Sequence, residues 1–274
     1  MEQTVNNNEN KSILSMTTNP IIRKLTKIDE TSESAVTYAG IAGKCGFFLV
    51  MIAIGVALAV VLQSISPMTM SVEGELVTFS VPAAAAAAVS GLIFIIMPLL
   101  AVTLHRTIPV TGSLFCISSG YLVNFMGLMM PTYQPLILLA FVLTLATVVG
   151  MALLYSRGVV RVTKKLRTVI TTLFLSTVAA GVLLLICALV PGLRPVAALF
   201  AGDPLVSIGI SVVYVVIAAL FLLVDFDEMQ RMVERRLDIK YEWVAAFALC
   251  YSVIWLYFKI LDLLIKASQA SKKK

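Results

Sequence analysis

Seven apolar stretches, each about twenty residues long and almost free of charge, fill the chain between Ile41 and Ile265. A hydrocarbon core about 30 Å thick needs roughly twenty apolar residues per helix. Only helices and closed barrels satisfy every backbone hydrogen bond in lipid, and the sequence lacks the period-two alternation of a membrane barrel. It therefore predicts an all-α polytopic membrane protein with seven transmembrane helices. We place these spans at residues 41–63, 82–104, 108–130, 133–154, 168–190, 204–224 and 241–265.

The composition leaves no room for a soluble domain of ordinary size beside the spans, because 59% of the 274 residues are hydrophobic and only 13% are charged. We expect one seven-span membrane domain over residues 41–265, with the first span acting as its own insertion signal. Residues 1–40 form a predicted cytoplasmic segment, of which 1–18 are expected to be disordered. Residues 266–274 form a basic tail.

The orientation follows from Lys and Arg residues in the short connections, which favour the cytoplasmic side. The N-terminal segment and the second, fourth and sixth connections are basic, whereas the opposite connections hold mainly acids. This predicts a multi-pass protein of the cell (inner) membrane with a cytoplasmic N-terminus. Seven crossings leave the basic tail outside, against the rule, and a re-entrant last segment would resolve that conflict. The basic residues of the N-terminal segment and of the second, fourth and sixth connections are Lys11, Arg23, Lys24, Lys27, Lys44, Arg106, Arg157, Arg161, Lys164, Lys165, Arg167, Arg231, Arg235, Arg236 and Lys240.

The cysteines and the net charge exclude several classes of protein. The four cysteines lie in or beside predicted spans with no CxxC spacing, so we interpret them as unclustered packing residues rather than a disulfide framework or a zinc site. Topology explains the net charge of +6, so no nucleic acid is expected as a partner. Nothing in the sequence indicates an enzyme or a cofactor. The lipid bilayer is the expected environment.

Ionisable residues within or at the end of a membrane span are functional candidates because burying them is costly. Asp225 directly follows the apolar run of the sixth span; it shares a helix face with Glu228, while Asp227 points elsewhere. The topology brings further polar groups to the same membrane face. Together they form either a titratable acid cluster or a solvated helix end balanced by nearby arginines. The further groups are His105 and Arg106 after the second span and Glu242 at the start of the last.

The last span also contains Lys259 and Asp262, three residues apart on one helix face. They can pair with each other, or Lys259 can extend its ammonium towards the outer interface. A structural role and a role in transport are both open for this pair.

Two blocks of sequence resemble the Bax inhibitor-1 family, in particular its bacterial YccA-like branch with an extended sixth connection. The first block is Asn19-Pro20-Ile21 followed by residues 37–46. The second, more specific block is Asp225-Phe226-Asp227, then residues 241–247 and 255–261. The resemblance implies a helical bundle with the last span near its centre. It also implies a pH-sensitive calcium leak in which an acid ending the sixth span pairs with one in the last, tuned by an arginine.

By this resemblance Asp225 is the first gating acid, but the position expected for the second acid holds Lys259. Glu242 or Asp262 could replace it, and Arg106, with His105 beside it, is the candidate tuning cation. The favoured function is thus a pH-sensitive calcium or cation leak channel. The alternatives are a non-transporting membrane interaction protein that regulates a membrane protease or stress machinery, and a proton-coupled transporter. A retinal protein and an intramembrane protease are disfavoured because their motifs are absent.

Overall fold

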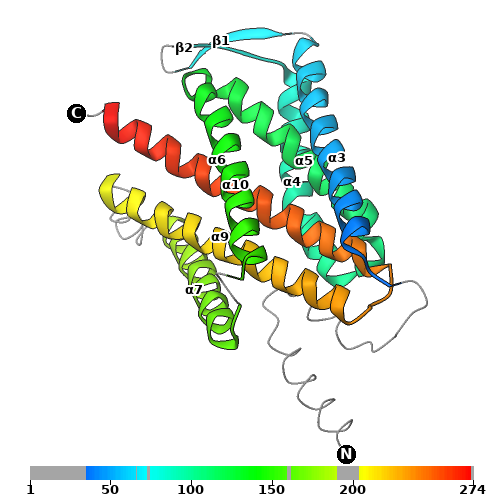
Figure 1. The fold of residues 1–274 in the computed structure, drawn as a ribbon. Coiled ribbons are helices and arrows are strands. Elements are labelled where there is room, and N and C mark those ends of the chain that lie inside the picture. Colours follow the sequence, from blue (N-terminus) through cyan, green and yellow to red (C-terminus); the bar gives the residue numbers. More distant parts are fainter. Residues whose placement is uncertain (1–34, 66, 73–74, 159–161, 190–203, 273–274) are drawn as a thin grey trace, which may run out of the picture. The chain divides into compact units, whose positions relative to one another are not determined.

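The computed structural model describes residues 35–65, 67–72, 75–158, 162–189 and 204–272. Within these residues, seven long helices and one β-hairpin follow each other along the chain (Figure 1). Two short 3₁₀ turns, η1 and η2, precede α5 and α6. The elements are α3 (Tyr38–Ser64), β1 (Met68–Val72), β2 (Glu75–Phe79), α4 (Val81–Thr103), η1 (His105–Thr107), α5 (Ile108–Met129), η2 (Pro131–Tyr133), α6 (Gln134–Ser156), α7 (Lys164–Leu189), α9 (Pro204–Glu234) and α10 (Tyr241–Lys272).

The helices confirm the predicted polytopic membrane bundle. Six of them, all except α7, are long and apolar enough to cross a membrane among the described residues. Helix α7 has 26 residues and occupies the fifth predicted span. Large apolar side chains remain exposed along the helices, as expected where lipid replaces water; examples are Leu49, Leu92, Leu138 and Val213.

Local signals explain where several helices begin. Thr37 adopts an extended conformation, and its hydroxyl accepts a hydrogen bond from the Gly40 amide, which caps α3. A proline lies in the first turn of α4 and of α5, where its missing N–H costs nothing. The sequence therefore carries clear start signals for these three helices.

The structure departs from the predicted spans in three places. Helix α10 continues beyond the predicted end at 265 to Lys272, so most of the predicted basic tail is helical. Helix α9 continues ten residues beyond the predicted end at 224, to Glu234, so Asp225 and Glu228 lie inside the helix rather than at its end. The first connection contains the antiparallel strands β1 and β2, with Met68 paired to Phe79 and Val72 to Glu75. No hairpin is predicted from the sequence of this connection. The predicted N-terminal segment lies outside the described residues up to position 34.

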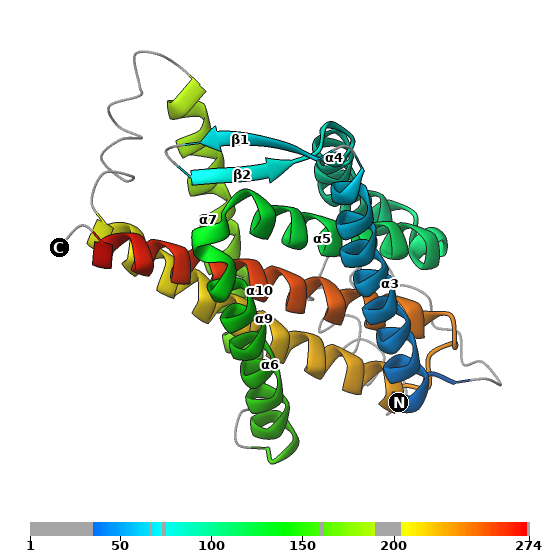
Figure 2. The same cartoon turned by 90° about the horizontal axis from the view of Figure 1, so that it is seen from above.

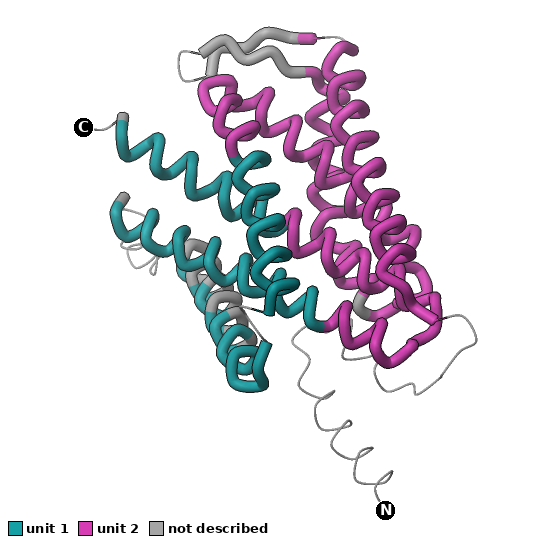
Figure 3. The backbone as a smooth tube through the Cα atoms, in the orientation of Figure 1, with its two compact units in different colours: residues 1–18, 140–227, 255–274 teal, residues 19–139, 228–254 magenta. Residues whose placement is uncertain are grey.

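The chain forms two compact units (Figure 3). The described part of the first unit comprises residues 140–158, 162–189, 204–227 and 255–272; that of the second comprises residues 35–65, 67–72, 75–139 and 228–254. Helices α9 and α10 are each divided between the two units, with one segment in each. In the most apolar 18-residue stretch of α10, 67% is buried, a larger share than in any other candidate span.

In the second unit, α5 packs against both α3 and α4. Small residues allow this contact: a Cβ atom on Gly55 would overlap the carbonyl oxygen of Ile117, and one on Gly120 would overlap that of Ile52. The Tyr121 hydroxyl donates a 2.8 Å hydrogen bond to a carbonyl of α4. Gly55 and Gly120 therefore have a packing role between α3 and α5.

In the first unit, a cluster of buried apolar residues joins α7 to α9. Val162 and Ile170 pack with Leu223 and Val224, and Tyr155 and other side chains of α6 cover the cluster. The rings of Tyr155 and Phe226 lie 6.1 Å apart. The apolar half of α9 is therefore held by helices of its own unit.

We predict that Gly55→Ala destabilises the protein by about 1–3 kcal/mol, because the new methyl group meets backbone atoms of α5 that cannot move aside. The matched control is Gly46→Ala on the same helix, where a Cβ atom has open space. Thermal unfolding in detergent measures both. Equal unfolding midpoints for the two variants would contradict the close approach of α3 and α5.

Candidate functional site

The carboxylate of Glu242, in the first turn of α10, is buried and joins α10 to the start of α3. Its Oε1 accepts hydrogen bonds from the backbone N–H of Thr37 at 2.9 Å and from the Thr37 hydroxyl at 3.0 Å. Its Oε2 forms an ion pair with the Lys44 ammonium. The Glu242 side chain is only 2% exposed, so these donors replace the water that the charge has lost.

Several features of the sequence favour a buried carboxylate at Glu242. Thr37 caps α3 and therefore already faces the beginning of that helix. Gly40 leaves the room that the carboxylate occupies, because a Cβ atom there would overlap it. A negative charge in the first turn of α10 is also favoured by the helix dipole. The carboxylate on α10 thus satisfies donors at the start of α3.

The backbone continues the same junction. The Val36 amide donates a 2.8 Å hydrogen bond to the Leu237 carbonyl, within the connection from α9 to α10. That connection closes α9 with Arg236 in the left-handed region at φ 51°. Outside the spans, the Lys240 backbone N–H lowers the pKa of the Asp238 carboxyl below its ordinary value. The starts of α3 and α10 consequently lie side by side, as Figures 1 and 2 both show.

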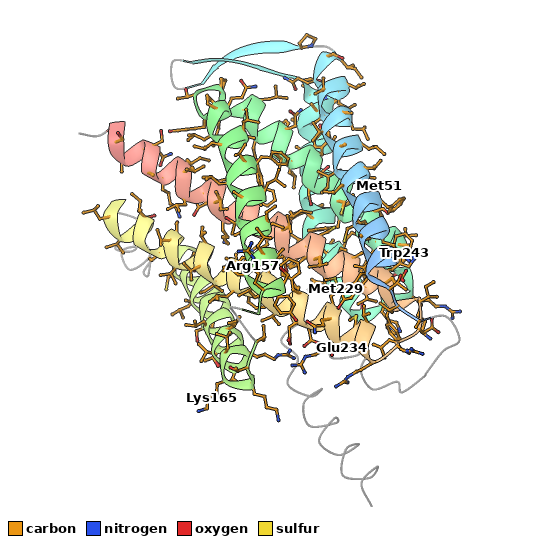
Figure 4. All side chains as sticks on the ribbon, in the orientation of Figure 1. Met51, Arg157, Lys165, Met229, Glu234 and Trp243 are labelled. Atoms are coloured by element: carbon orange, nitrogen blue, oxygen red, sulfur yellow. The ribbon has the colours of Figure 1, made fainter. Side chains whose placement is uncertain are left out.

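Aromatic rings pack next to the ion pair, further along α3 and α10. Phe48 lies 5.8 Å from the Trp243 ring and 6.1 Å from Phe247, in edge-to-face arrangements. Figure 4 labels Trp243 at the start of α10, next to α3. The Lys44 ammonium lies 5.3 Å from the centre of the same Trp243 ring. This packing limits water at the Glu242 carboxylate.

In the first unit, Asp227 forms an ion pair with Arg167, whose guanidinium donates to its Oδ2 at 2.6 Å. Both side chains are largely buried, with 5% of Arg167 and 14% of Asp227 exposed. Arg167 lies in the first turn of α7, so the pair ties this turn to α9. The interpretation of Asp227 as a solvated residue at a helix end is therefore wrong.

The C-terminal half of α10 has its own polar network. Asp262 accepts a 2.7 Å hydrogen bond from Lys266 and a 2.8 Å bond from the hydroxyl of Ser211 on α9. The Lys259 ammonium lies 4.8 Å from the centre of the Tyr214 ring and 5.7 Å from that of Trp255. Asp262 therefore bonds to Lys266, whereas Lys259 lies against two aromatic rings; a direct pair between Lys259 and Asp262 was one of two possibilities that the sequence left open.

The remaining site residues differ in exposure. Asp225 is 3% exposed and Glu228 is 2% exposed, so neither belongs to a solvated helix end. His105 and Arg106, the predicted tuning cations, are exposed in η1. No group of three His, Cys, Asp or Glu side chains in the described parts of the chain is arranged to hold a metal ion.

The interpretation of the cysteines as unclustered is wrong for three of them. Cys45 on α3 and Cys250 on α10 are close enough to interact, and Cys116 on α5 lies near both. All are free thiols. Their sequence separations gave no signal, because only the packing of three helices brings them together.

The roles of Thr37 and Lys44 were also missed. Two signals could have pointed to their junction with Glu242: a threonine cap before the first apolar run, and an acid opening the last. Neither signal says which helices meet. The pairing becomes visible only once the bundle is assembled.

These features define a polytopic helical membrane protein whose buried charges are held by contacts between helices. The chain matches the family model described as Bax inhibitor 1 like over residues 8–269, and it belongs to this family. No curated protein and no solved structure matches it. The family resemblance is thereby confirmed, whereas the branch within the family stays a prediction.

Replacement of Glu242 by Gln is expected to lower the free energy of unfolding by about 2–3 kcal/mol, because Lys44 loses its counter-charge in a partly buried place. Glu234→Gln serves as the control, since Glu234 is exposed on α9 and bonds only locally to Gln230 among its described contacts. Chemical or thermal unfolding in detergent compares the two. A Glu242→Gln variant as stable as the control would show that the junction does not depend on charge.

Proposed function

We propose that this Bax inhibitor-1 family member is a cation leak of the cell membrane, conducting calcium among other ions, and that Asp225 is its gating acid. The observation that carries the proposal is the burial of Asp225, which is 3% exposed and directly follows the buried apolar residues Leu222, Leu223 and Val224. A carboxylate in such surroundings is costly to keep charged, so its protonation can shift a balance between two conformations.

The two acids of α10 have structural contacts of their own. Glu242 holds the start of α3 through Thr37 and Lys44. Asp262 is bonded to Lys266 and Ser211. Because both acids of α10 have structural contacts, we assign them no primary role in gating. Glu228 lies one turn after Asp225 on α9 and is the nearest acid along that face, so we assign it a secondary influence.

The proposal includes an orientation. Lys44 and the connection that contains Arg235, Arg236 and Lys240 belong to the end at which α3 and α10 begin. Basic residues favour the cytoplasmic side, so we assign that end and the N-terminus to the cytoplasm. The first and the last of seven spans start on the same side of the membrane, because the number of spans between them is odd. The shared end of α3 and α10 therefore agrees with seven spans in total.

A second candidate function is a non-transporting interaction protein that regulates a membrane protease or stress machinery. The specific observation that favours it is Lys259, which stands where the family resemblance places a second acid and lies against the Tyr214 and Trp255 rings. A fixed positive charge at this position opposes the passage of cations. The protein would then retain the bundle without the leak.

Calcium flux into proteoliposomes between about pH 6 and pH 8 distinguishes the two candidates. For a leak, we expect native flux to change several-fold over this range and Asp225→Asn to remove most of the change. Lys259→Glu is expected to make the pH dependence steeper, because it restores a second acid. Glu234→Gln, an exposed change on the same helix as Asp225, should behave like the native chain.

Flux no greater than that of empty vesicles in all of these proteins would overturn the leak and favour the interaction protein. Native flux with an unchanged pH dependence in Asp225→Asn would keep the leak but remove Asp225 as its gating acid.

A further inference from the structure

Two thiols face each other where α3 meets α10. The thiols of Cys45 and Cys250 are close enough to interact. The Cys45 thiol in turn lies 3.9 Å from the carbonyl oxygen of Ala246, to which it donates. Ala246 and Cys250 are four residues apart and share one face of α10. The Cys45 sulfur therefore lies against this face, beside the Cys250 sulfur.

The two thiols differ in how a reagent can reach them. Cys45 is half-buried. Cys250 is only 7% exposed. A small oxidant therefore has access to Cys45 first, and Cys250 lies ready to react with the product.

We propose that Cys45 and Cys250 are a site of reversible oxidation, in which a hydroperoxide converts the thiol pair to a disulfide that links α3 to α10. The inference does not depend on ion flow and goes beyond the proposed function. In the first step the Cys45 sulfur attacks the peroxide, its O–O bond breaks, and Cys45 sulfenic acid and one water form with hydrogen peroxide.

In the second step the Cys250 sulfur attacks the sulfenic sulfur of Cys45. The S–O bond breaks, the hydroxyl leaves with the proton of the Cys250 thiol as water, and the S–S bond forms. Overall two thiols lose two electrons and two protons, and hydrogen peroxide becomes two waters. Excess thiol reductant reverses the reaction by exchange.

The geometry selects this pair over the other cysteines. Cys116 lies near both thiols, but it is completely buried and no described contact joins its sulfur to theirs. Cys187 is on α7, in the other unit, and is also buried. The link between Cys45 and Cys250 would join neighbouring side chains of two helices by an S–S bond of about 2.05 Å.

The link would fix the junction that Glu242, Thr37 and Lys44 already hold by non-covalent contacts. Because positions 45 and 250 are far apart in sequence, the disulfide closes a long loop and restricts the unfolded chain strongly. Oxidation should therefore raise the unfolding midpoint. It should also protect the Glu242→Gln variant, whose junction has lost its ion pair, more than the native chain.

The test treats the full chain, in membrane vesicles and in detergent, with hydrogen peroxide, followed by alkylation of the remaining thiols. Mass spectrometry is expected to find one intramolecular link between the peptides of Cys45 and Cys250, lost on addition of dithiothreitol. Cys45→Ser and Cys250→Ser each abolish the link. Cys116→Ser and Cys187→Ser retain it.

The native chain alone keeps the proposal testable if a variant fails to fold, because the linked peptides identify the cysteines directly. The proposal is overturned if Cys45 and Cys250 stay fully alkylatable after peroxide, if Cys45 stops at sulfonic acid without a link, or if the link joins Cys116 instead. A rise in the unfolding midpoint that persists in Cys45→Ser would also contradict it.

Discussion

The second unit depends on the contacts of the Glu242 carboxylate. A buried charge in a membrane bundle is costly unless an opposite charge or hydrogen-bond donors lie next to it. It receives the Thr37 amide and hydroxyl and the Lys44 ammonium, so one side chain fixes the start of the first described helix against the start of the last. The aromatic rings around Phe48 then pack below a junction that polar contacts have already set. The thiols of Cys45 and Cys250 lie further along the same pair of helices.

This constraint also divides the acids of the chain by role. The two acids of α10 are engaged, Glu242 at the junction and Asp262 with Lys266 and Ser211, and Asp227 is paired with Arg167. The proposal of Asp225 on α9 as the gating acid rests on its burial. An acid held by an adjacent cation contributes to stability in its charged form, so using it as a proton switch would weaken the fold.

The sequence alone was sufficient for the membrane class, the family and the approximate helices, because about twenty apolar residues per span is a strong signal. It also marked Glu242 and Asp225 as costly charges. It could not give their partners, since the pairing of Thr37 and Lys44 with Glu242 spans some two hundred residues and depends on which helices pack together. The cysteine contact escaped for the same reason. The continuation of α9 past residue 224 was missed because the predicted span ended at the first charged residues. A helix can continue through charged residues, and α9 does so as far as Glu234.

A double-mutant cycle on Lys44 and Glu242 tests the central claim most directly. The free energies of unfolding of the native chain, Lys44→Met, Glu242→Gln and the double variant are measured in detergent. If the buried carboxylate and Lys44 hold the junction together, the two single changes are non-additive, with a coupling energy of at least about 1 kcal/mol. Additive effects would contradict the account, because Glu242 would then stabilise the start of α10 without help from α3.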